Sequence, residues 1–351
     1  MSAQDQPGQL LFCGFEGVGI PDDLAGLIRA GRIGGVILFS RNVESPEQVR
    51  ALTTQLHRLA PEEAPLMIAV DQEGGRVQRL RSPWTEWPPM RVVGDCDDTG
   101  LTEEVARALA RELSDLGIQL DFAPCVDVDT NPANPIIGDR SFGRTPEHVA
   151  RHAKHFITAM QEAGVAACAK HFPGHGDTAT DSHLELPRLD HDLERLRAVE
   201  LPPFQAAIEA GVASIMTAHV LLPAIDPERP ATLAPGVMSL LRNELGYEGV
   251  VFSDDLEMKA VADRYSPREL VEGSFTAGVD ALLVCRSAEL RDEVLAGIER
   301  LGDATLAGPL ARMSRLKQSF QLSASARGKH LPPYAQHDAT ARSAESNRSQ
   351  S

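Results

Sequence analysis

Eight short apolar runs recur along the chain, each followed by a polar or glycine-rich stretch and then a helical pattern. The runs are continuous rather than alternating, which is typical of parallel strands that are covered on both faces. They span residues 10–15, 36–39, 66–70, 118–124, 165–169, 213–218, 250–252 and 281–285.

Two of the intervening helices have readable ends. Thr145 followed by Pro146 is typical of an N-cap with proline in the first turn, and Gly164 marks the end of the apolar stripe between them. A second helix is predicted to begin at Thr102 and to end at Gly117. Strands therefore alternate with helices, as in α/β proteins.

Eight strands alternating with helices over about 310 residues predict a single (β/α)8 barrel. A doubly wound open sheet is the second possibility, but residues 14–17 do not form a convincing glycine-rich phosphate loop after the first strand. We assign residues 1–322 to one catalytic barrel. Residues 323–351 are rich in Ser, Ala, Arg, Asn and Gln, so we expect them to form a flexible polar tail.

Charge and cysteine usage narrow the expected partners and location. The chain has 34 basic and 50 acidic residues and a net charge of −16, which argues against nucleic acid and anionic membranes as partners. No apolar run is long enough to span a membrane, and the first nine residues lack a signal-peptide pattern. The five cysteines form no CxxC pair. We expect a cytoplasmic, monomeric protein with a small-molecule substrate.

Ionisable residues follow four of the predicted strands. Because the carboxyl ends of barrel strands meet on one face, these side chains should converge on one pocket. They are Asp71, Lys170 with His171, His219, and Asp254 with Asp255. The alternative for an aspartate in such a place is a helix cap. Asp255 suits a cap better than Asp254, because it lies closer to the helix expected near Met258.

The densest polar segment contains three of the eleven histidines, His171, His175 and His183. Asp181 lies two residues before His183, and a carboxylate beside an imidazole raises its basicity for general acid and base catalysis. The segment could also be a solvated loop. A third possibility is a metal site formed by the three histidines and Asp177, although the spacing matches no standard zinc pattern.

Four segments together resemble one known family. They are DQEGGRVQR at 71–79, GDRSFG at 138–143, KHFPGHG at 170–176 with DSH at 181–183, and FSDDLEM at 252–258. In this order they resemble the bacterial β-N-acetylglucosaminidases of glycoside hydrolase family 3. The resemblance extends over roughly residues 10 to 320 and supports the barrel prediction.

The resemblance implies a role for each matching residue. Asp254 would be the catalytic nucleophile, and His183 would be the general acid and base, held in place by Asp181. The hydroxyls of a terminal N-acetylglucosamine would be bound by Asp71, Arg79, Arg140, Lys170 and His171. Glu257 departs from the family pattern, in which small residues are common at that place, and this bears on fine specificity.

The implied reaction is hydrolysis with retention, without a metal or an organic cofactor, on muropeptides in peptidoglycan recycling. Three alternatives stay open at this point. One is a phosphorylase that uses the same covalent intermediate. Another is a metal-dependent hydrolase on the same barrel, suggested by the histidine cluster. The third is a sugar-binding module without catalysis.

Overall fold

The structure, a computed structural model, describes residues 6–180, 186–321 and 334–348. Eight parallel strands close into a barrel in chain order. They are β1 (Leu11–Cys13), β2 (Gly35–Leu38), β3 (Met67–Val70), β6 (Leu120–Asp121), β7 (Ala166–Phe172), β8 (Ser214–Thr217), β11 (Val250–Asp255) and β12 (Ala281–Val284). Each strand overlaps one predicted apolar run. The barrel prediction is confirmed, and the open-sheet alternative is wrong.

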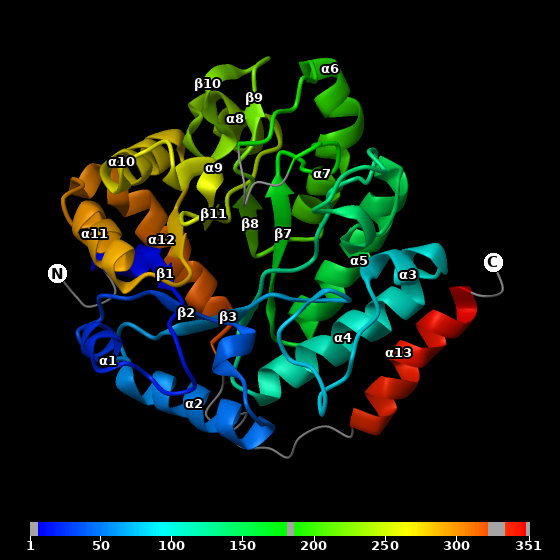
Figure 1. Cartoon of the computed structure of the whole chain (residues 1–351), viewed down its shortest axis with the longest axis horizontal. Helices are drawn as coiled ribbons and strands as arrows, with labels where there is room; N and C mark the ends of the chain where they lie inside the picture. Colours follow the sequence, from blue (N-terminus) through cyan, green and yellow to red (C-terminus); the bar gives the residue numbers. More distant parts are fainter. Residues whose placement is uncertain (1–5, 181–185, 322–333, 349–351) are drawn as a thin grey trace.

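The helices surround this barrel (Figure 1). They are α1 (Asp22–Arg29), α2 (Pro46–Leu59), α3 (Met90–Asp95), α4 (Thr99–Asp115), α5 (Pro146–Glu162), α6 (Leu193–Arg195), α7 (Leu201–Glu209), α8 (Pro235–Ser239), α9 (Lys259–Ala262), α10 (Pro267–Ala277), α11 (Ala288–Ile298), α12 (Asp303–Ser319) and α13 (Tyr334–Arg348). Two hairpins, β4 (Gln72–Gly74) with β5 (Val77–Gln78) and β9 (Leu221–Leu222) with β10 (Asp226–Pro230), lie outside the barrel sheet.

Aromatic rings help to fill the barrel interior. Phe252 of β11 packs edge to face against Phe12 of β1, with ring centroids 5.0 Å apart, and against Phe122, at 5.4 Å. All three side chains are fully buried. Edge-to-face contacts of this kind stabilise a core beyond the area that they bury. The interior is therefore a packed core that supports the site above it.

The helix predictions are correct in position, with one changed boundary. Helix α5 begins at Pro146 after the extended residue Thr145, and Gly164 follows its end with a φ of +91°. Helix α4 begins at Thr99 rather than at Thr102. Asp98 is its N-cap, because its carboxylate accepts hydrogen bonds from the first backbone amides of the helix.

Two strands extend further than their apolar runs. Strand β7 continues through Lys170 and His171 to Phe172, and β11 continues through Asp254 and Asp255. Their polar residues were predicted to follow the strands. These polar residues can belong to the strands because they line a polar cavity at the carboxyl end of the barrel, where their side chains form hydrogen bonds and ion pairs.

Within the segment predicted to be a flexible polar tail, residues 334–348 form a helix, α13. This helix lies beside α3 and α4 (Figure 1). Its inner face buries Ala341 and Ala344, and His337 Nδ1 lies 2.7 Å from the Glu112 carboxylate. Small alanines and one buried side-chain hydrogen bond hold the helix, and this is why its composition resembles that of an exposed segment. Among the described helices, none combines the length and apolarity needed to cross a membrane.

Candidate active site

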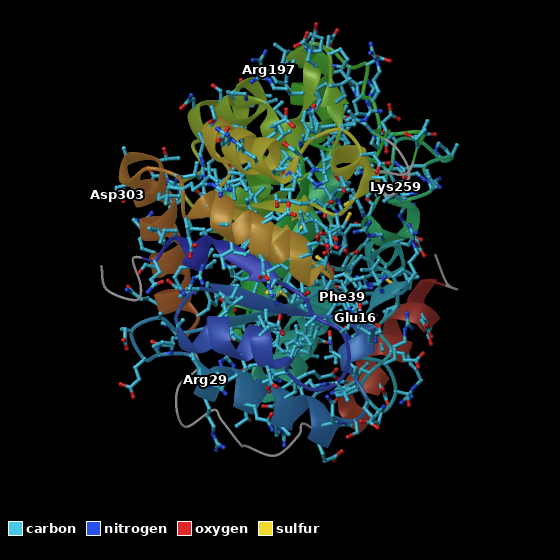
Figure 2. All side chains as sticks on the ribbon, turned by 60° about the vertical axis from the view of Figure 1, so that its left-hand side comes forward. Glu16, Arg29, Phe39, Arg197, Lys259 and Asp303 are labelled. Carbon is cyan, nitrogen blue, oxygen red and sulfur yellow. The ribbon has the colours of Figure 1, made fainter. Side chains whose placement is uncertain are left out.

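A cavity of about 190 Å³ opens at the carboxyl end of the barrel. Its polar lining includes Asp71, Lys170 and Asp254, which the sequence placed on one face. Phe39, which follows β2, lines it too and packs under the guanidinium of Arg41. Arg41 also pairs with Glu16, and Figure 2 labels Phe39 and Glu16. The cavity therefore combines charged groups with apolar surface, as small-molecule sites do.

Buried ion pairs link several charged residues of the cavity. Lys170 Nζ lies 2.7 Å from Asp71 Oδ1 and 2.7 Å from Glu73 Oε1. Arg140 donates two parallel hydrogen bonds to Glu73, of 2.8 and 2.7 Å, and Arg79 pairs with Asp71 at 3.1 Å. Paired and bidentate contacts of this kind hold charged groups in a fixed geometry.

The ion pairs determine the protonation states of these residues. Burial alone would raise the pKa of Glu73, but Arg140 and Lys170 outweigh it and hold that pKa far below its usual range. Burial would likewise lower the pKa of Lys170, but Asp71 and Glu73 raise it above its usual value. The carboxylates therefore stay ionised and the ammonium stays charged near neutral pH.

Arg79, which follows the β4–β5 hairpin, lines the cavity, and Glu73 within the hairpin pairs with the lining residues Arg140 and Lys170. The hairpin turn uses Gly74 at a φ of +102° and Gly75 at +55°, a left-handed backbone that favours glycine. A Cβ atom on Gly75 would lie 2.7 Å from Pro89 Cβ. The Gln72 side chain accepts hydrogen bonds from the amides of Arg79 and Leu80 and closes the hairpin. The fixed backbone of residues 71–79 therefore holds Asp71 and Arg79 at the cavity.

His171 is oriented by a buried carboxylate, Asp127. The two side chains meet at 2.7 Å through His171 Nδ1, and Arg140 Nη2 lies 3.3 Å from His171 Nε2. Asp127 also accepts the backbone amide of His175 at 2.7 Å. Because the guanidinium can only donate, Nε2 of His171 accepts and Nδ1 carries the proton. The ring is therefore fixed in one tautomer at the cavity wall.

Asp254 lies at the end of β11 with its carboxylate partly exposed in the cavity. Its Oδ1 accepts the amide of Asp255 at 2.8 Å. The Asp255 carboxylate accepts amides of Glu257 and Cys285, and burial raises the pKa of Asp255 to about 7. Asp255 is not the predicted N-cap, because α9 begins at Lys259 and its N-cap is Met258.

Two further sequence predictions concern residues beside the cavity. His219, which was expected to converge on the pocket, is fully buried and absent from the described cavity lining, with Nδ1 2.8 Å from Thr232 Oγ1 and Nε2 3.0 Å from the Asp255 carbonyl. Glu257 accepts the amide of Ser287 at 2.9 Å, so it fixes the loop before α11. Glu257 is absent from the described cavity lining. His219 and Glu257 therefore form hydrogen bonds that hold neighbouring segments in place.

The proposed acid and base residues, Asp181 and His183, lie outside the described residues. The structure describes the other three residues of the predicted metal site, His171, His175 and Asp177. Their ligand atoms do not cluster as a metal site would require. Asp177 pairs with His191 at 2.7 Å, whereas His175 binds Thr178 Oγ1 at 2.6 Å. Of the described members, His171 and His175 have ring centroids 5.9 Å apart, whereas Asp177 pairs with His191 instead.

A second set, Cys125, Asp127 and His171, offers donor atoms within 4.8 Å of one another. Asp127 already binds His171 Nδ1 and backbone amides, and burial raises the pKa of the Cys125 thiol well above its usual value. The thiolate that a metal requires is therefore disfavoured, and the other ligand atoms are engaged in hydrogen bonds.

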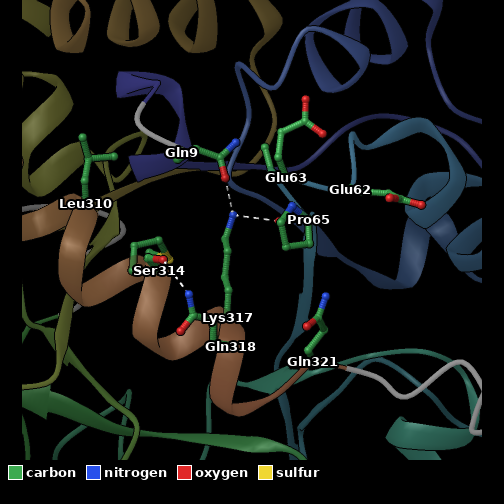
Figure 3. Close-up of a pocket in the computed structure, with 11 residues that line it drawn as sticks. Gln9, Glu62, Glu63, Pro65, Leu310, Ser314, Lys317, Gln318 and Gln321 are labelled. Atoms are coloured by element: carbon green, nitrogen blue, oxygen red, sulfur yellow. Dashed lines mark hydrogen bonds between the residues drawn. The ribbon is translucent and has the colours of Figure 1, made fainter. Parts of the chain in front are cut away.

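Another cavity, of about 170 Å³, lies at the amino end of the barrel (Figure 3). Lys317 of α12 points into it, and its Nζ donates to Gln9 Oε1 at 2.7 Å and to the Pro65 carbonyl at 3.0 Å. Burial lowers the pKa of Lys317 to about 7. In barrel enzymes this end supports stability, while the carboxyl end performs catalysis.

Residues 4–321 match the family model described as the glycosyl hydrolase family 3 N-terminal domain. The chain belongs to this family. It is a glycoside hydrolase, and the resemblance of its four motifs to family 3 is confirmed. Curated family 3 relatives include a β-hexosaminidase of Nitrosomonas eutropha, 40% identical over 76% of this chain and 78% of the relative. Another, from Thiobacillus denitrificans, is 42% identical over 80% and 79% of the two chains.

Solved structures of family 3 glycoside hydrolases have the same fold. A β-N-acetylglucosaminidase from a Paenibacillus species has a TM-score of 0.93 and 38% identity, covering 99% of this chain and 69% of that one. The native NagZ structure from Neisseria gonorrhoeae has a TM-score of 0.81 and 34% identity, covering 95% and 97%. These likenesses support the same barrel fold.

Sequence reasoning missed two carboxylates of this family 3 site. Glu73 links Lys170 with Arg140, and it lies inside the motif at 71–79, two residues after Asp71. Asp127 orients His171 and follows the apolar run at 118–124 by three residues. A wider search beyond each strand end would have found both of them, because the carboxyl end of a barrel is where charged groups converge.

Proposed function

We propose that this chain is an exo-acting β-N-acetylglucosaminidase, which removes terminal non-reducing N-acetylglucosamine from muropeptides of peptidoglycan recycling. The names of its relatives, β-hexosaminidase and β-N-acetylglucosaminidase, support this substrate class. The observation that carries the proposal is that the Asp254 carboxylate shares one small cavity with the paired residues Asp71, Lys170 and Arg140.

In the proposed reaction, Asp254 attacks the anomeric carbon and forms a covalent glycosyl-enzyme with inversion. His183, held by Asp181, protonates the leaving oxygen as the glycosidic bond breaks. Water activated by His183 then attacks the same carbon, releases Asp254 and inverts the centre again. The sugar leaves with net retention, and every proton is returned.

The hydrogen bond from the Asp255 amide supports the role of Asp254 as nucleophile. It holds one carboxylate oxygen while the partly exposed side chain faces the cavity. Because the pKa of Asp255 is raised to about 7 by burial, that neighbour is mostly neutral in mildly acidic solution. The Asp255 carboxyl group then adds little negative charge beside Asp254.

The buried charges are suited to binding neutral hydroxyl groups. Asp71 offers carboxylate oxygens that accept hydrogen bonds, while Lys170, Arg140 and Arg79 are donors. His171, fixed in one tautomer, stands beside Arg140. Because each cation has a carboxylate partner, the site does not select for anions. We propose that these residues bind the sugar hydroxyls and fix its orientation.

The size of the cavity supports exo action on one sugar ring. Its volume of about 190 Å³ is below the roughly 300–1,000 Å³ of pockets that enclose drug-sized ligands. A single ring can enter, and the rest of the substrate must extend outward. Terminal residues are therefore the proposed point of cleavage.

The test uses nitrophenyl β-N-acetylglucosaminide in phosphate-free buffer, with wild type, Asp254→Asn and the exposed control Asp263→Asn. We expect Asp254→Asn to lower kcat/KM by at least about 10³-fold, equivalent to about 4 kcal/mol, and the control to leave it unchanged. Proton NMR during wild-type turnover should show the β-anomer as the first product.

Other outcomes separate the alternatives. Inactive wild type that becomes active with phosphate, with release of a sugar 1-phosphate, would identify a phosphorylase instead. Activity lost on chelation and restored by zinc would identify a metal-dependent hydrolase. Sugar affinity in a folded chain without any turnover would identify a binding module. Full activity of Asp254→Asn would exclude Asp254 as nucleophile.

A further inference from the structure

Two histidines and an aspartate meet outside the barrel, away from the cavity described above. His148 and His152 lie four residues apart on α5, so they share one helix face, and their ring centroids are 4.6 Å apart. Asp97 lies between α3 and α4, with its carboxylate 3.6 Å from His148 Nδ1. One donor atom from each residue lies within 4.8 Å of the others.

The hydrogen bonds of His148 leave one ring nitrogen available as a ligand. Its Nε2 lies 3.1 Å from the carbonyl of Gly94, which can only accept, so Nε2 carries the proton. Nδ1 therefore carries the lone pair. Arg151 Nη2 lies 3.3 Å from that nitrogen, as a donor to this lone pair would. A backbone carbonyl on the other ring nitrogen is a common feature of metal-binding histidines.

His152 shows the same division between its two nitrogens. Its Nδ1 lies 2.7 Å from Thr102 Oγ1, and that hydroxyl is placed to donate to the Asp98 carbonyl at 3.2 Å. Nδ1 of His152 then donates to the hydroxyl, and Nε2 carries the lone pair. His152 is fully buried, and its Nε2 has no hydrogen-bond partner. A buried acceptor without a partner is costly unless something else binds it.

The guanidinium of Arg151 already lies beside Asp97 and His148. Arg151 Nη2 contacts the Asp97 carboxylate and lies near His148 Nδ1, so the guanidinium stands between two of the three donor atoms. The Arg151 side chain is 43% exposed, and that of Asp97 is 67% exposed. Both can therefore move without disturbing the core. Asp97 also has a φ of +53°, an uncommon conformation for a residue other than glycine.

We propose that Asp97, His148 and His152 bind a divalent transition-metal ion of the zinc type, which displaces the Arg151 side chain. Two imidazole nitrogens and one carboxylate oxygen match zinc, whereas calcium and magnesium prefer oxygen ligands. Zinc bonds of about 2.1 Å place tetrahedral donor atoms about 3.4 Å apart, so Asp97 moves inward on binding. The ion links the turn before α4 to α5 and stabilises their packing.

The experiment titrates Zn²⁺ into the chelator-treated full chain by calorimetry and Co²⁺ by visible absorption. We compare wild type with Asp97→Asn and His148→Ala, both away from the barrel core, and with Arg151→Ala. We expect Asp97→Asn and His148→Ala to weaken binding at this site by at least about tenfold. Arg151→Ala should tighten it, because the competing cation is removed. Zinc bound elsewhere would not respond to these three changes in this pattern.

Thermal unfolding provides a second readout for the same variants. Zinc should raise the Tm of wild type and of Arg151→Ala, and should raise that of Asp97→Asn much less, because a ligand stabilises only the form that binds it. Equal zinc affinity in wild type, Asp97→Asn and His148→Ala would overturn the proposal. An affinity not raised in Arg151→Ala would overturn it as well.

Discussion

Lys170 and Lys317 are both buried, at opposite ends of the barrel, and their surroundings shift their pKa values in opposite directions. Lys170 lies at the carboxyl end between two carboxylates, which raise its pKa despite burial. Lys317 lies at the amino end and donates to an amide oxygen and a carbonyl. Burial lowers its pKa to about 7.

The difference shows that burial alone does not determine the charge of a lysine. A charged group removed from water keeps its charge where opposite charges replace the lost hydration, and tends to neutralise elsewhere. The carboxyl end holds a set of fixed charges that can bind and orient a polar substrate. The amino end holds one lysine whose state depends on pH.

Removing the ammonium group of Lys170 should change both stability and activity more than any other substitution in this comparison. Lys170→Met leaves Asp71 and Glu73 without their shared partner, so we expect unfolding free energy to fall by about 3–5 kcal/mol. The kcat/KM for the aryl glucosaminide should fall at least about 100-fold, equivalent to about 3 kcal/mol. Urea unfolding and steady-state kinetics measure both.

Lys317→Met is the matched control at the other end. Because the site is remote from the cavity, we expect kcat/KM to stay within about twofold of wild type. Equal losses of activity in the two variants would show that the two ends are not functionally distinct.

The next effect concerns the pH dependence of stability at the amino end. The folded-state pKa of Lys317, about 7, lies below its ordinary value of 10.5, so between these values only the unfolded chain binds the proton. The contribution of Lys317 to unfolding free energy therefore rises with pH over this window, by at most about 1.4 kcal/mol per pH unit. Below pH 7 its penalty is constant.

Urea unfolding of wild type and Lys317→Met at pH 7, 8 and 9 measures this effect. The difference in unfolding free energy between the two proteins should move in favour of wild type as pH rises. A difference that is constant across the three pH values would contradict the lowered pKa.

A smaller change is expected at helix α13, which packs against α3 and α4. His337→Ala leaves the buried Glu112 carboxylate without one of its partners, so we expect a loss of about 1–2 kcal/mol of unfolding free energy. Activity should be unchanged. The exposed Arg342 on the same helix provides the control, and Arg342→Ala should have almost no effect. Loss of activity in His337→Ala would instead connect the helix to the cavity.

The barrel could be predicted because its signal is local and repeated. Each strand is a continuous apolar run, and burial of both faces requires that pattern. Asp71, Lys170 and Asp254 could be placed together because the topology alone brings strand ends to one face. Neither inference needs knowledge of any particular side-chain contact.

The features that were missed depend on contacts between distant segments. Glu73 becomes important only where Arg140 and Lys170 meet it, 67 and 97 residues further along the chain. Helix α13 has a weakly apolar composition, and it is stabilised by small alanines and the pair between His337 and Glu112. Such pairings cannot be read from a local pattern, because each partner alone resembles a solvated residue.

We propose that Asp254 carries the covalent intermediate, and trapping the glycosyl-enzyme is a direct test of that role. A 5-fluoro N-acetylglucosaminyl fluoride forms the glycosyl-enzyme readily but slows its breakdown, because fluorine destabilises the cationic transition state. Peptide mass spectrometry of the inactivated enzyme should find the added sugar on Asp254. A label on another residue, or time-dependent inactivation of Asp254→Asn at the wild-type rate, would contradict the account.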